Sequence, residues 1–256
     1  KISEGIISLN VTQKKELRSL YEQRGKAKKK VKFTPASGVA TRMFKGLFEY
    51  LSAVNQDEGK ENEMLPPTDQ VAHFLNHLSE FPFYETLKAG LIEKGIFEEA
   101  PKEIIKELLQ EKGLNYGQFP KGLIKFHAYP GGTRTPVEEH LVEGCLYAAD
   151  DQGRVHIHFT ISAHHHESFD RHLKEVRKGY EEAYGKIIEI TLSEQKTATD
   201  IIAVDLKNDP FRKDDGSLLF RPAGHGALLE NLNEIDADLI FIKNIDNISI
   251  DRYPSE

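Results

Sequence analysis

The 256-residue sequence contains one cysteine, Cys145, no tryptophan and only two methionines. A single cysteine excludes an internal disulfide framework, and this one lies in an apolar stretch, residues 141–149, where a buried structural thiol is expected. No run of about 18 apolar residues occurs, so we expect no transmembrane helix. The N-terminus has no signal-peptide pattern. These absences together predict a protein of a reducing, cytoplasmic compartment.

Positive charge is also scarce. The chain has 34 Lys and Arg against 41 Asp and Glu, with a formal net charge of -7 and a pI of about 5.9. Nucleic acid is therefore not an expected partner, since binding it in bulk needs a positive field against the phosphates. An anionic substrate must instead be met by a locally basic pocket. The length allows one large domain or two modest ones.

Hydrophobic spacing predicts strands that alternate with helices. The predicted strands cover residues 31–34, 123–128, 155–162, 187–192 and 239–244. The predicted helices cover residues 11–23, 41–54, 136–149, 165–184 and 226–234. Residues 201–204 are either one more strand or an extended edge piece. The fold class is therefore α/β, a Rossmann-like, mostly parallel sheet with helices on both faces, whose ligands bind beyond the carboxyl ends of the strands.

The chain divides into an N-terminal helix with a basic linker, residues 1–30, and an α/β domain, residues 31–256. Residues 55–67 are polar and predict a loop. Residues 68–118 show helical spacing throughout, which predicts a helical insertion of three or four helices. The basic run at 24–30 is either a solvated linker or an electrostatic lip beside a phosphate site.

The loop at residues 34–43 follows the first strand and is the strongest local signal. Ser37 and Gly38 allow a tight turn, and Gly38 lets backbone N–H groups approach an anion. A helix starting near Thr41 would direct its positive end to the same place. Arg42 adds a fork of donors suited to phosphate. Taken alone, the loop is equally consistent with an ordinary strand-to-helix turn.

Three later segments also contain residues suited to binding a nucleotide or its metal ion. Lys121 follows a rigid proline and can reach a phosphate, while Gly224 and Gly226 flank His225 just before a helix, where small residues admit a flat base or ribose. Asp246 follows the last apolar strand, where a carboxylate is suited to Mg²⁺ bridged to phosphates. Lys121 and Asp246 also have simpler explanations, a loop lysine and an Asx turn.

The order of these pieces resembles a known superfamily. Residues 35–43 resemble the Gly-x-Gly-Thr-Arg-Met/Leu signature of nucleotidyltransferases, and residues 120–122 the Pro-Lys-Gly of UDP-sugar pyrophosphorylases. Residues 224–226 resemble their Gly-Asn/His-Gly segment, and residues 244–247 the Asn-x-Asp-Asn that follows it. The resemblance spans about residues 31–248, and it is strongest to a bacterial domain-of-unknown-function family placed in that superfamily.

This resemblance implies a GT-A fold of the nucleotidyltransferase type. It implies Mg²⁺-dependent transfer of a nucleotidyl group from a UTP-like nucleoside triphosphate to a sugar phosphate, with release of pyrophosphate. Ser37, Gly38, Thr41 and Arg42 would cradle the triphosphate. Lys121 would stabilise charge on the α-phosphate, so that Arg42 and Lys121 are the implied catalytic residues. Such catalysis is positioning plus electrostatics and requires no covalent nucleophile.

The resemblance also implies that Gly224, His225 and Gly226 contact the nucleotide and that Asp246 holds the metal. The sequence departs from the family pattern at Ala40, whose methyl group replaces a glycine where backbone is expected to approach phosphate.

Two alternatives stay open at this level. Ala40, Ala227 in place of an acid, and the few residues after Asp246 favour a non-catalytic nucleotide or sugar-nucleotide binding protein of the same fold, or an N-terminal part of a longer protein. A scaffolding domain that docks a partner through residues 68–118 is the other. The histidines at 156, 158 and 164–166 are expected at a surface and a helix cap rather than in a metal site.

Overall fold

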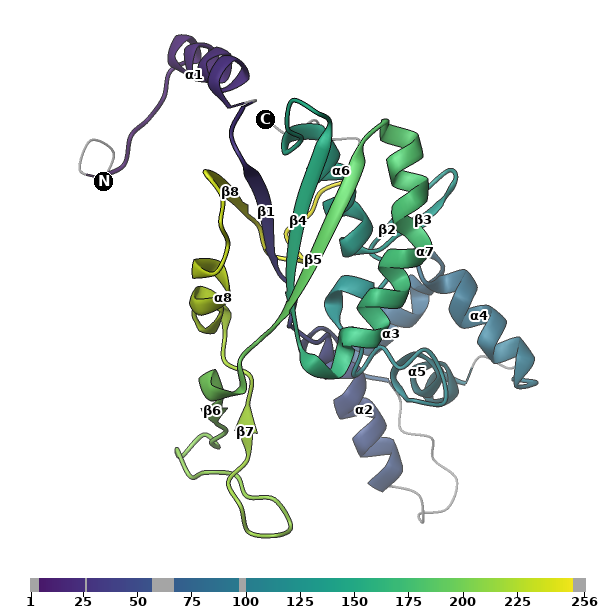
Figure 1. Cartoon of the computed structure of the whole chain (residues 1–256). Coiled ribbons are helices and arrows are strands. Elements are labelled where there is room, and N and C mark those ends of the chain that lie inside the picture. Colours follow the sequence, from purple (N-terminus) through teal and green to yellow (C-terminus); the bar gives the residue numbers. More distant parts are fainter. Residues whose placement is uncertain (1–4, 26, 57–66, 97–99, 251–256) are drawn as a thin grey trace.

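The computed structural model describes residues 5–25, 27–56, 67–96 and 100–250, apart from the side chain of His225. The predicted loop at 55–67 therefore falls mostly outside the described residues. A parallel four-stranded sheet forms the centre of the α/β fold, in the order β5-β4-β1-β8 (Figure 1). Its strands are β1 (Lys30–Pro35), β4 (Arg154–Ile161), β5 (Ile187–Glu194) and β8 (Leu239–Ile242). The expected mixed α/β fold with a parallel sheet is confirmed, and its strand order is consistent with a Rossmann-like fold.

Helices flank both faces of the sheet. On one face, α6 (Pro136–Tyr147) and α7 (His166–Tyr184), which follows the 3-10 turn η4 (Ala163–His165), cover Val155, Ile157 and Phe159 of β4. The next side chains along β4 point to the opposite face because strand residues alternate. There α8 (Leu229–Asn233), preceded by the 3-10 turn η6 (His225–Leu228), is tied to β5 by Asn231, which donates to Ser193 Oγ at 3.0 Å.

Local sequence explains where α6 begins. Thr135 is the N-cap, and its hydroxyl accepts a hydrogen bond from the backbone N–H of Glu138. Glu138 reaches back to the amide of Thr135 at 2.7 Å, completing a capping box, and Pro136 occupies the first helical position. Glu138 thus acts as a helix-start acid.

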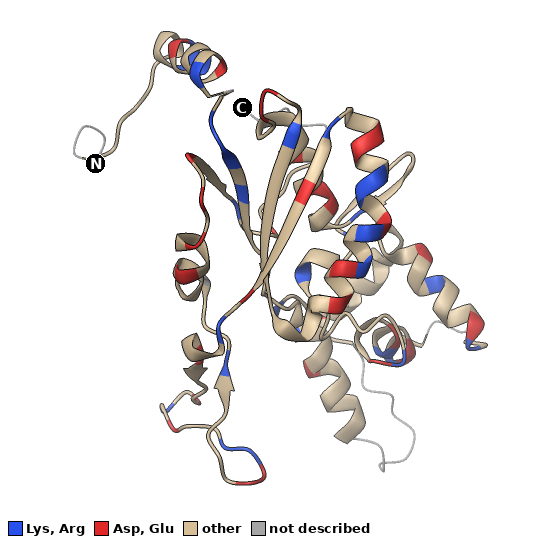
Figure 2. Cartoon of the chain, in the orientation of Figure 1, with Lys and Arg blue, Asp and Glu red and all other residues tan. Residues whose placement is uncertain are grey.

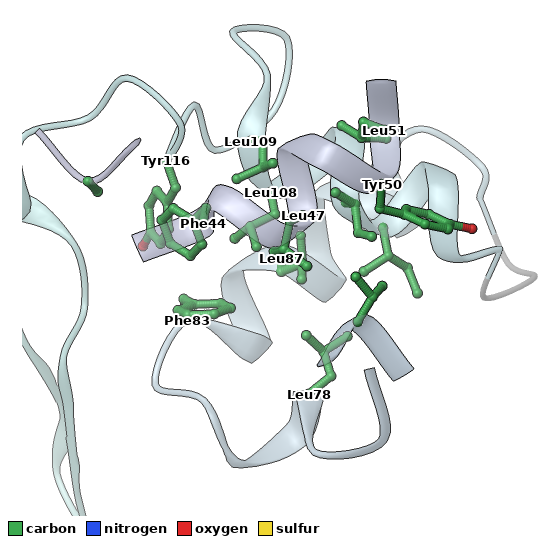
Figure 3. Packing of buried hydrophobic residues seen from close by; sticks show 14 of the residues in the cluster. Phe44, Leu47, Tyr50, Leu51, Leu78, Phe83, Leu87, Leu108, Leu109 and Tyr116 are labelled. Carbon is green, nitrogen blue, oxygen red and sulfur yellow. The ribbon is translucent and has the colours of Figure 1, made fainter. Parts of the chain in front are cut away.

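A second core lies within the helical part of the chain. It is built by α2 (Lys45–Gln56), α3 (Asp69–Asn76), α4 (Tyr84–Glu93) and α5 (Pro101–Leu109), with the 3-10 turns η1 (Thr41–Phe44) and η2 (Leu78–Glu80). Figure 3 shows Leu47, Leu87 and Leu108 meeting at the centre of this core. Within the predicted helical block at 68–118, three α-helices form between Asp69 and Leu109 and pack against α2, which precedes them in the chain, whereas residues 110–118 form turns.

The predicted strand at 123–128 is wrong. The segment holds the 3-10 turn η3 (Lys121–Leu123) and the short strand β2 (His127–Tyr129), which pairs with β3 (Gly132–Arg134) outside the main sheet. The physical reason is that its apolar residues serve two cores: Leu123 packs beside the sheet, whereas Ile124 packs in the helical core. The segment therefore turns between the two cores instead of extending along the sheet.

Two segments lie away from the body of the molecule (Figure 1). The helix α1 (Val11–Arg24) is attached near its end, where the Tyr21 hydroxyl donates to the Tyr147 carbonyl at 2.9 Å. The segment after β5 contains the 3-10 turn η5 (Thr197–Thr199) and a hairpin of β6 (Ile201–Ile202) with β7 (Phe220–Arg221). Residues 201–204 are therefore an extended piece outside the sheet. None of the helices in the described ranges is long and apolar enough to cross a membrane.

Candidate functional site

The strand order creates a topological switch point at one place on the carboxyl edge of the sheet, and the space beyond it is called the crevice below. After β1 the chain goes to β4 on one side, whereas β8 flanks β1 on the other, so connections diverge between β1 and β8. Open α/β sheets bind ligands at such a point. Beyond the strand ends the two segments remain joined, because the Ile245 amide donates to the Pro35 carbonyl at 3.1 Å. This pairing holds Gly38 and Asp246, which follow directly, at the same edge.

Lys121 links the segments after β1 and β8. Its backbone N–H donates to the Gly38 carbonyl at 3.0 Å, and its Nζ donates to Asp246 Oδ2 at 2.7 Å. The Lys121 and Asp246 side chains are 18% and 39% exposed, so solvent and ligands reach the ion pair. Three motifs that lie far apart in the sequence therefore meet at the predicted edge.

Gly122 explains how Lys121 is placed. A Cβ atom at Gly122 would lie 2.9 Å from Phe169 Cζ and 3.1 Å from Ile245 Cγ1, both closer than carbon atoms pack. Glycine is thus the residue that lets η3 lie against α7 and the segment after β8 together. The Pro-Lys-Gly motif has a packing role in addition to its lysine.

Several residues of the loop after β1 are exposed to solvent. Gly38 and Arg42 are exposed, and Ser37 is half-buried. A Cβ atom at Gly38 would meet no described atom within 4 Å, so the space above this backbone is open. The regular helix begins only at Lys45, because residues 41–44 form a 3-10 turn, so the predicted helix start at Thr41 is four residues early. Backbone N–H groups near the loop therefore belong to a 3-10 turn rather than to a long α-helix.

Two other residues of the loop tie it to the helical part of the molecule. The Thr41 hydroxyl donates to the Gly117 carbonyl at 3.0 Å and so ties the loop to the end of the helical block. Ala40 is fully buried in the helical core, and its amide donates to the Phe119 carbonyl at 3.1 Å. The expectation that the Ala40 methyl group would crowd a phosphate is wrong, because that methyl packs into the core.

The segment at 224–226 lies at the other end of the same edge. Gln195, directly after β5, donates through Nε2 to the Ala223 carbonyl at 3.1 Å, and its backbone N–H donates to the Ile161 carbonyl at 2.9 Å. β5 is two strands from β1, roughly 10 Å at the usual strand spacing. Gly224 and Gly226 are exposed, whereas the side chain of His225 lies outside the described atoms. A nucleotide lying along the edge could therefore span from Gly38 toward Gly224.

An ionic cluster lies beneath the crevice, between β1, β8 and α6. Lys32 Nζ donates to Glu143 Oε2 at 2.6 Å, and Lys243 Nζ donates to Glu143 Oε1 at 2.6 Å. Burial lowers the pKa of Lys32 to about 8 despite the Glu143 carboxylate. Burial acts to raise the pKa of Glu143, but the ammonium groups of Lys32 and Lys243 outweigh it and hold that pKa below its ordinary value.

His140 connects this cluster to the segment that carries Asp246. Its Nε2 lies 3.1 Å from the Asn244 carbonyl and 3.2 Å from the Ile245 carbonyl, so Nε2 carries the proton and donates. Its Nδ1 is buried without a hydrogen-bond partner among the described residues, 3.8 Å from Glu143 Oε2. Burial lowers the pKa of His140 to about 3. A neutral imidazole thus fixes the backbone just before Asp246.

The roles of Lys32, Glu143 and His140 beneath the candidate site were not predicted from the sequence. A signal was present in Lys32, which occupies an inward position of a strand whose residues are all buried. A lysine at such a position requires an anionic partner. That partner, Glu143, follows 111 residues later, and only the packing of α6 on the sheet brings it close.

The basic run at 24–30 does not border this site. Lys28 and Lys29 pair with Asp238 and Asp236 at 3.8 and 2.6 Å, at the amino end of β1 and β8. Figure 2 shows this positive charge at the start of β1, at the opposite end of the strand from the crevice. The interpretation of the run as a lip beside the phosphate site is therefore wrong.

The remaining candidate groups have structural partners. His158 lies between Thr191 Oγ1 at 2.7 Å and Ser193 Oγ at 2.8 Å, and His156 pairs with Glu189 at 3.0 Å. The described residues contain no group of three side chains that could hold a metal ion. Cys145 is buried, as expected, and burial raises its pKa to about 11.

Comparison with known proteins identifies the family. A family model described as Domain of unknown function (DUF4301) matches residues 1–256. The chain belongs to this family. The expected membership of a domain-of-unknown-function family is thereby confirmed. Neither the curated proteins nor the solved structures gave a match to the DUF4301 chain.

Proposed function

We propose that this DUF4301 chain is a Mg²⁺-dependent nucleotidyltransferase of GT-A type. It would bind a UTP-like nucleoside triphosphate at the crevice between β1 and β8 and transfer the nucleotidyl group to a sugar phosphate in the cytoplasm. The observation that carries the proposal is the contact of Lys121 with both Gly38 and Asp246. A loop backbone, an ammonium and a carboxylate are the groups that a metal-bound triphosphate requires, and here they meet at a ligand-binding edge.

The proposed reaction is a displacement at phosphorus. An oxygen of the acceptor phosphate attacks the α-phosphorus of the triphosphate, and the bond from that phosphorus to the bridging oxygen breaks. The electron pair of this bond leaves with pyrophosphate. Lys121 would stabilise the charge that grows on the α-phosphate, and Arg42, exposed beside the loop, would bind the outer phosphates. The acceptor phosphate is already a nucleophile, so no general base is needed.

The residues present suit a magnesium ion that is shared with the substrate. Asp246 offers one partly exposed carboxylate, and Mg²⁺ is commonly held by one or two carboxylates together with phosphates and water. When bound, Mg²⁺ would neutralise phosphate charge. The Lys121 ammonium lies 2.7 Å from Asp246 Oδ2, and a bound substrate phosphate would draw it away from this oxygen. Lys121 would then transfer from a carboxylate to a phosphate over a short distance.

Pyrophosphate release tests the proposal. The chain is incubated with Mg²⁺, each nucleoside triphosphate and a panel of sugar 1-phosphates, alongside the variants Arg42→Ala and Arg18→Ala. Arg18 is an exposed arginine of α1 and serves as the matched control. We expect release with one triphosphate, its reduction in Arg42→Ala and no change in Arg18→Ala. A triphosphate-dependent rise in melting temperature without any release would instead establish the non-catalytic binding protein.

A further inference from the structure

An apolar pocket of about 340 Å³ opens in the helical part of the molecule. Phe44 of η1 lines it together with four phenylalanines from α3, the α3–α4 connection and the segment after η3: Phe74, Phe81, Phe83 and Phe126. Met43 of η1 adds a flexible apolar wall, and this side chain is 49% exposed. The volume lies within the usual range for small-molecule sites, which are largely apolar with a few polar groups.

The pocket and the candidate site share the same two chain segments. Gly38 and Lys121 belong to the site, whereas Met43 and Ile124 line the pocket. Ile124 is three residues from Lys121, so their Cα atoms lie at most about 11 Å apart. The two segments are also bonded to each other, since the Ala40 amide donates to the Phe119 carbonyl. The pocket and the candidate site are therefore neighbours along both segments.

The phenylalanine rings that line the pocket pack against one another and against Tyr116. The ring of Phe81 lies 5.1 Å from that of Phe74 and 5.2 Å from that of Phe83, between ring centroids. Phe83 in turn contacts Tyr116 edge-on at 5.5 Å, and Figure 3 shows Phe83 directed toward Tyr116 and Phe44. Mutually packed rings keep the wall of the pocket in place without a ligand.

The polar groups of the pocket indicate the charge of its ligand. They are the amide of Gln70 and the ammonium of Lys125, which donates to Thr86 Oγ1 at 2.7 Å. None of the described residues that line the pocket is acidic. A ligand with an anionic group is therefore favoured over a cationic one.

We infer that this pocket binds the apolar part of the acceptor, which is a phosphate ester with a hydrophobic ring or chain attached. The phosphate would lie at Lys121 and Arg42, and the hydrophobic group would enter between Met43 and the four phenylalanines. This inference rests on the proposed function, since it assigns the acceptor of that reaction. It narrows the acceptor from any sugar phosphate to one that carries an apolar substituent.

Binding of 2-naphthyl phosphate, measured by isothermal titration, tests the inference on the full chain, with inorganic phosphate as the reference. We expect 2-naphthyl phosphate to bind at least about tenfold more tightly than inorganic phosphate, which corresponds to about 1.4 kcal/mol. Met43→Glu introduces a charge at an exposed position of the pocket and should weaken the binding of 2-naphthyl phosphate about tenfold. Leu146→Glu, at a 65% exposed position of α6, is the matched control and should change nothing.

A further variant and a comparison with UTP binding distinguish the possible outcomes. Gln70→Glu is nearly isosteric. It should weaken the binding of 2-naphthyl phosphate and leave the binding of neutral 2-naphthol unchanged. Equal affinity for 2-naphthyl phosphate and inorganic phosphate, with UTP still bound, overturns the inference and leaves the proposed function standing. Bound 2-naphthyl phosphate without any UTP binding removes the proposed function, and the assignment of an acceptor falls with it.

Discussion

Two lysine–carboxylate pairs lie near each other, one under the crevice and one at its rim. Lys32 and Glu143 are 2.6 Å apart, and Lys121 and Asp246 are 2.7 Å apart. Their chemistry and geometry are the same, but the Lys32 side chain is fully buried whereas the rim pair is partly exposed. Burial decides what each pair can do. The buried pair cannot be broken without leaving a charge in an apolar environment, whereas the rim pair can exchange its partner for a ligand.

Breaking the buried pair should have the largest effect. Glu143→Leu leaves Lys32 without its anion, and removing one partner of a buried pair typically costs about 3–5 kcal/mol of the free energy of unfolding. Urea denaturation followed by circular dichroism measures this loss. The double variant Lys32→Met with Glu143→Leu removes both charges and should regain most of the stability. A double variant as unstable as Glu143→Leu would contradict a role for the buried charge.

Acid should destabilise the cluster through His140. Its pKa is lowered to about 3, below the ordinary 6.5, so between these values the unfolded chain binds a proton that the folded chain does not. Stability contributed by the neutral ring is thus complete above pH 6.5 and is lost as the pH falls toward 3, by about 1.4 kcal/mol per pH unit. His140→Gln keeps a donor for the two carbonyls but does not titrate. Its unfolding free energy should fall less steeply between pH 6 and pH 4, and parallel curves would exclude His140.

Most of the sheet, and part of the candidate site, can be predicted from local sequence. The strands β1, β4 and β5 are visible because their apolar residues recur at every second position, and β8 is visible as a short continuous apolar run. The contact of Lys121 with Asp246 agrees with the expectation that both approach the carboxyl edge. The role of His140 is invisible because its partners lie 104 and 105 residues away. The inward direction of Ala40 is equally hidden, since it depends on the helical core beneath the loop.

Overpacking at Gly122 should lower stability by an amount between the effects of breaking the buried pair and the rim pair. Gly122→Ala would place a methyl group 2.9 Å from Phe169 and 3.1 Å from Ile245, and overpacking of this kind costs about 1–3 kcal/mol. Relief of the clash moves η3 and with it Lys121, so the affinity for UTP should fall as well. Thermal unfolding and UTP titration measure the two effects. Gly179→Ala in α7, where a Cβ atom meets no described atom within 4 Å, is the control: it should leave the affinity for UTP unchanged and should raise stability by about 0.5–1 kcal/mol, because alanine favours a helix interior over glycine.

Changing the rim pair should have the smallest effect on stability and the sharpest effect on ligand binding. Asp246→Asn removes a partly exposed ion pair, and such pairs contribute about 0–1 kcal/mol. Any increase in melting temperature that requires both Mg²⁺ and UTP should disappear, because the amide no longer supplies a charged oxygen ligand. Asp151→Asn, an exposed acid near the start of β4, should retain that increase. An unchanged response to magnesium in Asp246→Asn would remove Asp246 from the proposed metal site. A large loss of stability would instead show that the rim pair holds the fold together as the buried pair does.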